Sequence, residues 1–230
     1  MQPVVVAIDG PSGSGKSSVS RAVARHFGYG YLDTGAMYRA VTVYCLRQGI
    51  DLSDADAVVA AAEELPLGLG ADPDDPAVTL DEEDIAAAIR TSEVSAVVSA
   101  VATNLGVRAV LQDAQRELID AIAEDWGGVV AEGRDITTVV APDADVRVLL
   151  TASEEARLAR RSTELHGSAD EAAVAATHDQ IVRRDRDDST VSQFTEAADG
   201  VVLLDTSALD FDGSVAALVE IVTATLARAS

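Results

Sequence analysis

Cysteine, histidine and aromatic residues are scarce in this sequence, and each shortage excludes a class of site. The single cysteine, Cys45, excludes a disulfide framework and a cysteine-based metal site. The three histidines, His26, His166 and His178, are too scattered for a zinc site. Aromatic residues make up 3% of the chain, so Ala, Val, Leu and Ile must fill the core. The 48% hydrophobic content is enough for such a core and excludes a disordered chain.

Long apolar runs are also missing. No stretch approaches the ~18 to 20 apolar residues that a membrane span needs, and the beginning of the chain does not resemble a signal peptide. We therefore expect a soluble, cytoplasmic protein without a membrane partner. The length of 230 residues suits one sizeable α/β domain with a small insert.

Positive charge is scarce, with 17 basic residues against 39 acidic ones and a net charge of −22. A field of this sign disfavours binding to nucleic-acid polymers and to anionic membranes. Adaptation to high salt, or a codon bias that favours Asp, Ala and Arg over Lys, explains the total most simply. If the ligand is an anion, the few arginines must be concentrated where it binds.

Strands and helices alternate along the chain, which predicts an α/β fold with a parallel sheet covered on both faces. Residues 66–79 are rich in Gly, Pro and Asp, as is typical of turns and short strands in a small insert. The expected strands are 2–9, one that ends near 31–32, 129–132, 146–150 and 200–206. The expected helices are 16–27, 34–47, one capped at Ser53 or Asp54 and running through 64, one from about 92, 107–124, 153–166, 171–186 and 213–229.

The stretch GPSGSGKSS, residues 10–18, has the P-loop pattern between an apolar strand and a helix. Its glycines let backbone N–H groups turn toward phosphate oxygens, and the positive end of the following helix points at the same anion. Lys16, the only lysine in the chain, is expected to reach the β- and γ-phosphates, and Ser17 to ligate Mg²⁺. The residues expected to bind ATP are Gly10, Pro11, Ser12, Gly13, Ser14, Gly15, Lys16, Ser17 and Ser18.

The P-loop predicts a nucleoside triphosphate but does not define the reaction. The guanine-reading N-K-x-D element of a GTPase is impossible here, because the only lysine lies in the P-loop and the only asparagine is Asn104. The run from Val129 to Glu132 is a poor match to the acidic strand end of a regulatory ATPase. A small-molecule kinase fits the length better.

Three arginine-bearing clusters indicate that the acceptor is itself anionic. The motif DTGAMYR, residues 33–39, places Thr34 and Arg39 after a strand, where an open α/β sheet forms its ligand crevice. The motif EGRD places Arg134 and Asp135 at the same edge of the sheet.

The third cluster lies on two late helices. Arg157, Arg160 and Arg161 share one helix face, and Arg184 and Asp188 are four residues apart. Arginine-rich helices late in a P-loop kinase suit a lid that closes on the transferring group. Surface pairing of these arginines with Glu154, Glu155 and Asp185 is an equally acceptable interpretation of this cluster alone.

Six sequence motifs follow one another along the chain: DGPSGSGKSSVSR, LDTGAMYRA, AIRTSEVSAVVSAVA, VRAVLQDAQREL, VAEGRDITTVV and RRDRDDST. Together, over about residues 3–207, these motifs resemble the bacterial cytidylate (CMP/dCMP) kinases of the nucleoside monophosphate kinase group. The resemblance implies a five-stranded parallel sheet in the order 2-3-1-4-5. It also implies a core of about 1–62 and 105–230, an NMP-binding insert of about 63–104 and a lid of about 153–188.

The resemblance further implies transfer of the γ-phosphoryl group of ATP to CMP or dCMP, with Mg²⁺ as cofactor and with no partner beyond these small molecules. The implied CMP-binding residues are Thr34, Arg39, Ser99, Arg108, Arg134, Asp135, Arg184 and Asp188. Of these, Arg39, Arg134 and Arg184 would contact phosphate, Ser99, Arg108 and Asp135 the cytosine, and Asp188 the ribose. The implied catalytic residues are Lys16, Arg134, Arg157, Arg160, Arg161 and Arg184.

The chemistry is consistent with a site that has many cations and no histidine base. An acceptor phosphate is largely dianionic near neutral pH, its second pKa being about 6, so no general base is needed. Countercharge and in-line positioning of two anions then supply the catalysis. We expect Lys16→Ala to abolish turnover with little loss of folding, because the side chain faces ligand rather than core.

The sequence departs from the family pattern at three places. Thr137 stands where family members commonly have the glycine of GRDIGT, and Glu82 stands where a glycine is usual in the insert. An arginine that often follows the D-S-T element is absent from residues 189–194, STVSQF. The last departure concerns base affinity or lid closure rather than the class of reaction.

Two other functions stay open from the residues. One is a P-loop kinase of another small acceptor, such as UMP or another NMP; shikimate is a weak candidate, because its acidic D-x-D signature is replaced by DTG. The other is a nucleotide-binding regulator that has lost turnover. A monomer is expected, since no strong apolar interface stripe stands out.

Overall fold

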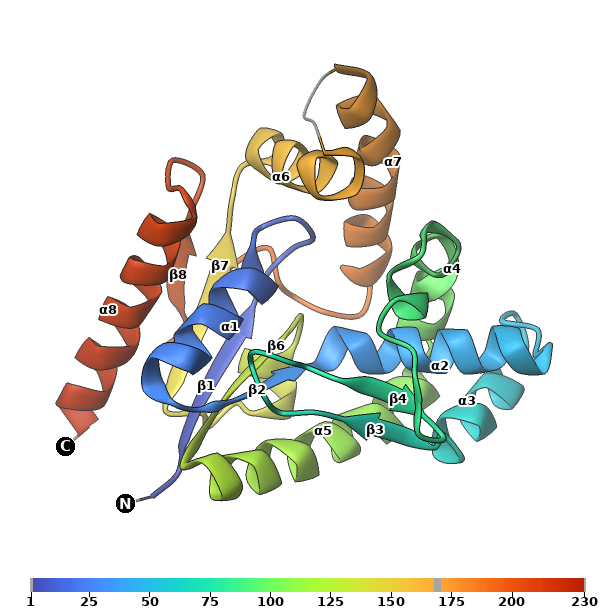
Figure 1. The fold of residues 1–230 in the computed structure, drawn as a ribbon, viewed down its shortest axis with the longest axis horizontal. Coiled ribbons are helices and arrows are strands. Elements are labelled where there is room, and N and C mark those ends of the chain that lie inside the picture. Colours follow the sequence, from blue (N-terminus) through green and yellow to red (C-terminus); the bar gives the residue numbers. More distant parts are fainter. Residues whose placement is uncertain (1, 168–170, 230) are drawn as a thin grey trace.

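A five-stranded parallel sheet forms the centre of the fold (Figure 1). The computed structural model describes residues 2–167 and 171–229. The sheet contains β1 (Val4–Asp9), β2 (Gly30–Asp33), β6 (Gly128–Gly133), β7 (Val146–Thr151) and β8 (Val202–Asp205), in the order β2-β6-β1-β7-β8. When these five strands alone are numbered along the chain, that order is 2-3-1-4-5, which confirms the predicted topology.

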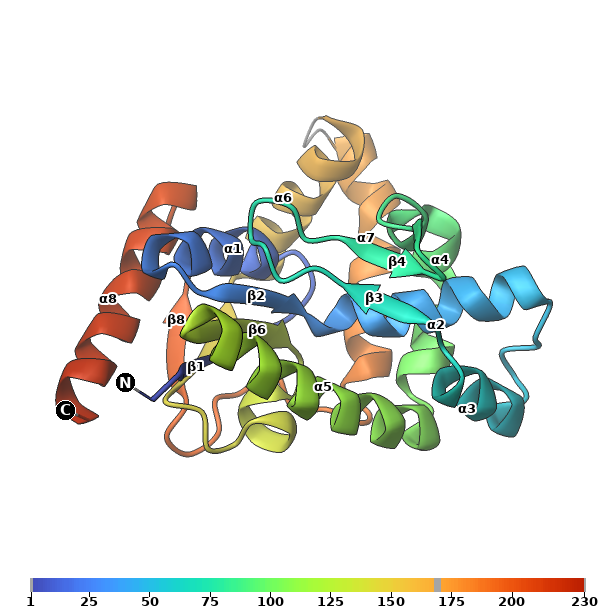
Figure 2. The same cartoon turned by 60° about the horizontal axis from the view of Figure 1, so that its bottom comes forward.

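Helices cover both faces of this sheet. Figures 1 and 2 show α1 and α8 against one face and α5 against the other, while α6 and α7 stand beyond the carboxyl ends of the strands. The helices are α1 (Lys16–Phe27), α2 (Thr34–Gln48), α3 (Ala55–Glu63), α4 (Ser92–Ala102), α5 (Leu105–Trp126), α6 (Glu154–His166), α7 (Glu171–Asp188) and α8 (Phe211–Ala229). A short 3-10 helix (Ala88–Arg90) precedes α4, and a π-helix, η2 (Ile136–Val140), follows β6.

The predicted element boundaries differ from the observed ones by a few residues. β1 begins at Val4 rather than at residue 2, and α8 begins at Phe211 rather than at residue 213. The helix expected from residue 107 begins at Leu105, because the Asn104 side chain caps it by accepting the N–H groups of Gly106 and Val107 at 3.0 and 3.3 Å.

The insert contains a three-stranded antiparallel sheet of β3 (Leu67–Leu69), β4 (Val78–Leu80) and β5 (Glu83–Asp84). Asp81 and Glu82 make the turn between β4 and β5 with φ angles of 49° and 68°. A positive φ at both turn positions favours Gly, Asn or Asp, which explains why a glycine is common where Glu82 stands.

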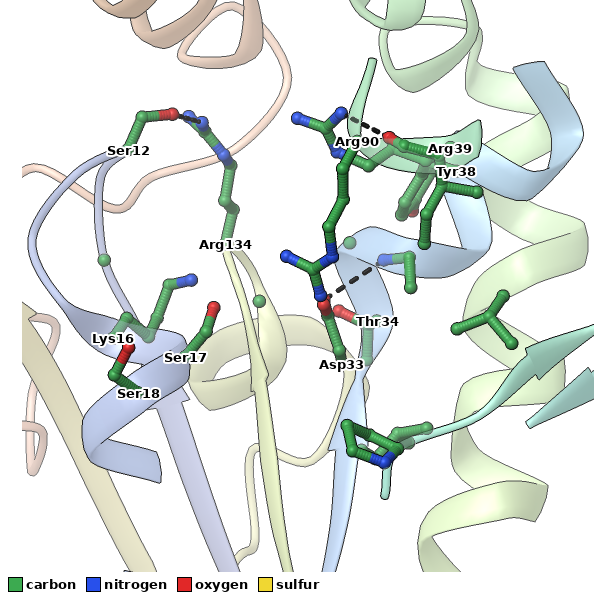
Figure 3. A pocket seen from close by; sticks show the side chains of 18 of the residues that line it. Ser12, Lys16, Ser17, Ser18, Asp33, Thr34, Tyr38, Arg39, Arg90 and Arg134 are labelled. Atoms are coloured by element: carbon green, nitrogen blue, oxygen red, sulfur yellow. Dashed lines mark hydrogen bonds between the residues drawn. The ribbon is translucent and has the colours of Figure 1, made fainter. Parts of the chain in front are cut away.

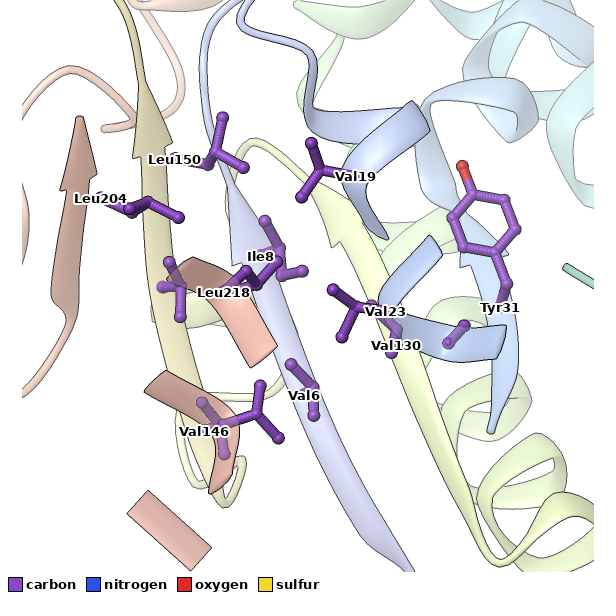
Figure 4. Packing of buried hydrophobic residues seen from close by; sticks show 13 residues of the cluster. Val6, Ile8, Val19, Val23, Tyr31, Val130, Val146, Leu150, Leu204 and Leu218 are labelled. Carbon is purple, nitrogen blue, oxygen red and sulfur yellow. The ribbon is translucent and has the colours of Figure 1, made fainter. Parts of the chain in front are cut away.

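The core lies on both faces of the parallel sheet because side chains alternate along each buried strand. Val6 and Ile8 of β1 pack toward α1 and α8, as Figure 4 shows, whereas Ala7 packs toward α5 and η2. All three side chains are fully buried. The strands are therefore held rigidly, and their carboxyl ends form a fixed edge on which a site can be built.

Within the described residues, no single helix is long and apolar enough to cross a membrane. In this part of the chain, α4 and α5 are long and apolar enough when taken together, but the two helices are bent by 97° with respect to each other.

Candidate active site

A cavity of about 620 Å³ opens at the carboxyl ends of β1, β2 and β6, between these strands, residues 69–95 and the helices α6 and α7. In Figure 3, Lys16, Ser17 and Ser18 lie on one side, Asp33, Arg39 and Arg90 on the other, and Arg134 between them. The predicted residues that line it are 10–18, Thr34, Arg39, Arg108, Arg134, Asp135, Arg161, Arg184 and Asp188. Three predicted residues, Ser99, Arg157 and Arg160, do not line it in the part of the chain that the structure describes.

The P-loop wraps one end of the cavity. Gly13 and Gly15 have φ angles of 75° and 88°, which a residue with a side chain rarely adopts. Gly15 precedes α1 and offers no side chain to cap it, so the N–H groups of the first turn are not taken by a capping side chain. This helix end is the expected place for phosphate oxygens.

Lys16 is held by a buried carboxylate. Its Nζ donates to Glu132 Oε2 at 2.6 Å, and the Tyr31 hydroxyl donates to the other oxygen of Glu132. Burial raises the pKa of Glu132, but the charge of Lys16 and hydrogen bonds from Lys16, Ser17 and Tyr31 outweigh it and keep that pKa below its ordinary value. Glu132 therefore stays ionised and fixes the ammonium group beside the P-loop.

Asp33 is a second acidic group at this end. Its side chain caps α2 by accepting the N–H of Ala36 at 3.1 Å, and Arg90 extends toward it from the insert side (Figure 3). Burial and the charge of Glu132 raise the pKa of Asp33, against the opposing charges of Lys16 and Arg90. Thr34, the next residue, donates its hydroxyl to the carbonyl oxygen of Glu132 at 2.8 Å.

Several arginines converge on the cavity and repel one another. Burial lowers the pKa of Arg39 to about 10, and the charges of Arg161, Arg90 and Arg134 add to this. Burial also lowers the pKa of Arg184 to about 9, with further contributions from Arg134 and Arg39. Both guanidinium groups remain charged at neutral pH, so the cavity concentrates positive charge.

Arg39 is anchored to the insert. Its Nη1 donates to the carbonyl oxygen of Ile89 at 2.7 Å and to Ser95 Oγ at 3.1 Å. The two contacts span 50 and 56 residues of sequence, so the position of Arg39 depends on how Ile89 and Ser95 pack against α2.

Arg134 is surrounded by groups of α7 and the P-loop. Its guanidinium group pairs with Asp185 at 2.9 Å and with Asp188 at 3.1 Å, and it donates to Ser12 Oγ at 2.6 Å. The ring of Phe194 lies beneath it, with the ring centroid 4.4 Å from Cζ. The predicted pairing of Arg184 with Asp188 is also present, at 3.6 Å.

Arg108 and Asp135 form a buried pair at the other end of the cavity. Arg108 Nη2 donates to Asp135 Oδ2 at 2.6 Å, and Gln112 donates to the same oxygen at 2.7 Å. Tyr38 lies below Arg108, with 5.9 Å between its ring centroid and Cζ. Ser99 is half-buried on α4, and its carbonyl oxygen accepts the hydroxyl of Thr103 at 2.7 Å.

The arginines of α6 separate into two groups. Arg157 donates to the carbonyl oxygen of Ser12 at 2.9 Å and pairs with Asp185, one of the acidic residues considered as a surface partner. Arg160 donates to the carbonyl oxygens of Ser14 at 2.9 Å and Thr206 at 2.6 Å. Both side chains therefore hold the backbone of the P-loop by hydrogen bonds, whereas Arg161 lines the cavity.

Thr137 joins the end of β1 to η2. Its N–H and hydroxyl donate to Asp9 Oδ2 at 2.8 and 2.6 Å, and the N–H of Ile136 donates to Oδ1 at 2.9 Å. Burial raises the pKa of Asp9 to about 6, although these hydrogen bonds oppose the shift. Thr137, which replaces the glycine common in the family, thus links this turn to Asp9 by an additional hydrogen bond.

Sequence reasoning gave no role to Asp33, Arg90, Glu132 and Asp185. Asp33 and Arg90 belong to the motifs DTGAMYR and AIRTS. Membership of these motifs could have identified both as candidate site residues. Glu132 was considered only as a poor acidic strand end, yet it faces the single lysine. Asp185 was considered only as a surface partner, and its central place depends on how α7 packs.

The described residues contain no group of three or more His, Cys, Asp or Glu side chains that could hold a metal ion by themselves.

Residues 6–224 match the family model described as cytidylate kinase. A cytidylate kinase of Cutibacterium acnes is 48% identical over 225 residues, covering 97% of this chain and 98% of that protein. Cytidylate kinases of Rhodococcus opacus and Nocardia farcinica are 49% and 50% identical, covering 95% and 91% of this chain and 94% and 89% of those proteins. An uncharacterized protein from Eubacterium ventriosum shares the fold, with a TM-score of 0.50 at 11% identity over 94% of this chain and 96% of that one.

Proposed function

The chain belongs to the cytidylate kinase family, and from this membership we propose how its residues carry out the family's reaction. It transfers the γ-phosphoryl group of ATP to CMP or dCMP, giving ADP and CDP or dCDP. The roles of individual residues below are proposals.

One observation carries the assignment of the acceptor site. In a chain of net charge −22, Arg39, Arg90, Arg134, Arg161 and Arg184 line one cavity opposite the P-loop. Arg39 and Arg184 have lowered pKa values, caused by burial and by neighbouring arginines. A bound dianion relieves this repulsion, so the arrangement favours an acceptor that carries its own phosphate.

The donor occupies the P-loop. Backbone N–H groups of residues 13–18 and the amino end of α1 hold the phosphates, and Lys16 contacts the β- and γ-phosphates. Glu132 keeps Lys16 beside the loop before ATP arrives. A compact ammonium group serves here where a planar guanidinium would not fit between two phosphates.

The acceptor lies between Arg39, Arg134 and Arg184 at its phosphate and Arg108 and Asp135 at its base. A phosphate oxygen of CMP attacks the γ-phosphorus, a new P–O bond forms, and the bond from the γ-phosphorus to the β,γ-bridging oxygen breaks. No proton must be removed from a dianionic acceptor, so the protein contributes position and countercharge.

Asp188 is available for the ribose. Its Oδ2 atom pairs with Arg134 and Arg184, whereas Oδ1 is buried without a hydrogen-bond partner among the described residues. A buried carboxylate oxygen without a donor is costly, and a ribose hydroxyl of the acceptor supplies that donor. Ser99 lies outside the cavity wall, and its contact with cytosine requires movement of α4.

Mg²⁺ fits the oxygen donors at the P-loop end. The Ser17 hydroxyl and the Asp33 carboxylate line that end of the cavity, and Mg²⁺ usually takes one or two protein oxygens together with substrate phosphates and water. When bound, the ion neutralises developing charge on the phosphate oxygens. Ser17 and Asp33 would hold the ion there.

We assign Arg161 to the transferring group and Arg157 and Arg160 to positioning of the P-loop, because the latter two donate to its carbonyl oxygens. The division into a core of about 1–62 and 105–230, an insert of about 63–104 and a lid of about 153–188 stays a proposal. So does a monomeric state.

A coupled assay of ADP release with ATP and CMP, dCMP, UMP, AMP or GMP tests the function. We expect CMP and dCMP to be used best, and chelation of Mg²⁺ to abolish the reaction. A rate with AMP or UMP about tenfold above that with CMP, equivalent to ~1.4 kcal/mol of transition-state stabilisation, contradicts the assignment.

A further inference from the structure

The loop after α7 contacts two cavity arginines from behind, and we infer that Ser192 in this loop is a positioning residue for recognition of the acceptor base. The inference rests on the proposed function. Residues 191–194 lie where the resemblance led us to expect an arginine, yet none of the four is cationic.

The loop is attached to the end of the lid. The N–H groups of Val191 and Ser192 donate to the carbonyl oxygen of Asp188 at 3.2 and 3.1 Å, so the chain turns sharply where α7 ends. Ser192 is 8% exposed and Phe194 is fully buried. Both side chains therefore point inward, although the helix before them belongs to the lid.

Ser192 holds the guanidinium group of Arg108. Its Oγ accepts from Arg108 Nη2 at 2.8 Å, and the same nitrogen donates its second hydrogen to Asp135 Oδ2 at 2.6 Å. Arg108 Nη1 donates to the carbonyl oxygen of Ala102 at 3.2 Å. Because a guanidinium group has five N–H donors, Nε–H and one Nη1–H remain without a hydrogen-bond partner among the described residues. These are the donors that Arg108 can offer to a ligand in the cavity.

Phe194 supports the other arginine. Its ring lies 4.4 Å from Cζ of Arg134, whose sequence neighbour Asp135 is the partner of Arg108. The loop therefore contacts the phosphate end of the acceptor site through Phe194 and the base end through Ser192. A neutral loop thus orders two arginines that come from elsewhere in the fold, in place of supplying one of its own.

Removal of the Ser192 hydroxyl leaves an N–H of a buried charged group without its acceptor, which is costly. Arg108 then turns to find another acceptor, and the two donors that it can offer to a ligand lose their direction. The loss falls on the base and not on ATP, because the P-loop lies at the opposite end of the cavity. A residue that merely filled space would not act selectively in this way.

Steady-state kinetics of Ser192→Ala, Ser192→Thr and Ser189→Ala with CMP, UMP and ATP test the inference. For Ser192→Ala we expect the KM for CMP to rise about tenfold, as for a lost hydrogen bond to a charged group. The KM for ATP should change by less than about twofold, and the ratio of kcat/KM for CMP to that for UMP should fall about fivefold or more. Ser192→Thr keeps the hydroxyl and should restore both quantities.

Ser189→Ala is the matched control, since Ser189 lies in the same turn but is exposed and donates to the carbonyl oxygen of Arg186 at 2.7 Å. It should behave as the wild type. If Ser192→Ala does not fold, the nearly isosteric Ser192→Cys takes its place.

A wild-type KM for CMP and a wild-type CMP/UMP ratio in the hydroxyl-deleted variant would overturn the inference while leaving the proposed function intact. Parallel loss toward CMP, UMP and ATP with a lowered Tm would overturn it too, because that pattern marks a structural role. Failure of the wild-type protein to phosphorylate CMP would instead contradict the proposed function.

Discussion

At the scale of one residue, Lys16, for which we propose a phosphate contact, is held in place by a buried carboxylate without any ligand. Its side chain is 16% exposed and pairs with Glu132, which is 1% exposed, at 2.6 Å. Glu132 also accepts the hydroxyl of Tyr31. The expectation that Lys16 faces only ligand was incomplete, because its loss leaves a buried carboxylate without a countercharge.

We therefore expect Lys16→Ala to lower turnover at least about a hundredfold and also to lower the free energy of unfolding by about 2–4 kcal/mol. The double variant Lys16→Ala/Glu132→Gln should regain most of the stability and none of the turnover. Urea unfolding together with single-turnover kinetics measures both. An unchanged rate in Lys16→Ala would mean that Lys16 does not contact the transferring phosphate.

Arg39 offers a test of the acceptor site. Arg39→Ala should raise the KM for CMP more than about tenfold, through loss of a charged phosphate contact, and the KM for ATP by less than about twofold. Arg47→Ala is the control, because Arg47 lies on the same helix but forms an exposed pair with Glu83 at 2.9 Å. Equal increases in both KM values for Arg39→Ala would place Arg39 outside the acceptor site.

At the scale of elements, the junction between β1 and η2 contains a buried carboxylate, Asp9, whose ionisation changes near neutral pH. The pKa of Asp9 is raised to about 6 by burial, against an ordinary value of 3.8. A raised pKa in the folded state means that this group favours folding below its unfolded pKa, and that this contribution is lost as the pH rises through about 6.

Thr137→Ala removes the hydroxyl that donates to Asp9 at 2.6 Å. We expect the pKa of Asp9 to rise further, because the ionised form loses a donor. The variant should be about 1–3 kcal/mol less stable than the wild type at pH 8, and the difference should narrow at pH 5, where Asp9 is protonated in both. Urea unfolding at the two pH values measures this, and a destabilisation equal at both would mean that the hydroxyl acts by packing alone.

The α6 helix also shows how spacing and packing together divide similar residues. Arg157 and Arg160 reach the carbonyl oxygens of Ser12 and Ser14, whereas Arg161 lines the cavity. Arg160 and Arg161 are adjacent, so their side chains are about 100° apart around the helix axis. This rotation directs Arg160 to the P-loop and Arg161 to the cavity. The sequence grouped these three arginines on one face, and the neighbouring P-loop divided their functions.

At the scale of the whole molecule, the net charge of −22 opposes both compaction and the binding of two polyanions. The arginines clustered in one cavity offset the negative charge there, so anions can bind in it. The opposition to compaction remains, since most of the acidic side chains of the described residues are exposed and do not line that cavity.

Salt should therefore stabilise this protein. Between 0.02 and 0.5 M NaCl the Debye length falls from above ~10 Å to well below it, so the surface charges no longer repel one another. We expect this screening to raise the free energy of unfolding by about 2 kcal/mol and Tm by about 4–8 °C. The rise should level off above 0.5 M, as screening does, in contrast to a continuous effect of solvent exclusion. Calorimetry measures it, and a Tm that falls with salt would show that attractive ion pairs outweigh the repulsion.

Much of the fold followed from local patterns. The P-loop helix begins at Lys16 and ends at Phe27 as predicted, because its glycines and apolar spacing act within a few residues of each other. The β2–α2 and β6 turns place Thr34, Arg39, Arg134 and Asp135 at one sheet edge, since parallel strands bring their carboxyl ends together. The identity of the acceptor, CMP or dCMP, was predicted from the resemblance of the whole chain to cytidylate kinases.

The sequence by itself thus determined the class of fold, the nucleotide site and the presence of a second, anionic ligand. Only the tertiary structure decided which partner each charged group has. Glu132 meets Lys16 across 116 residues, Asp185 meets Ser12 across 173, and Ser192 meets Arg108 across 84. Such pairs depend on strand register and on how α7 packs, which sum many weak contacts over the whole chain, whereas motifs and caps depend on neighbours only a few residues away.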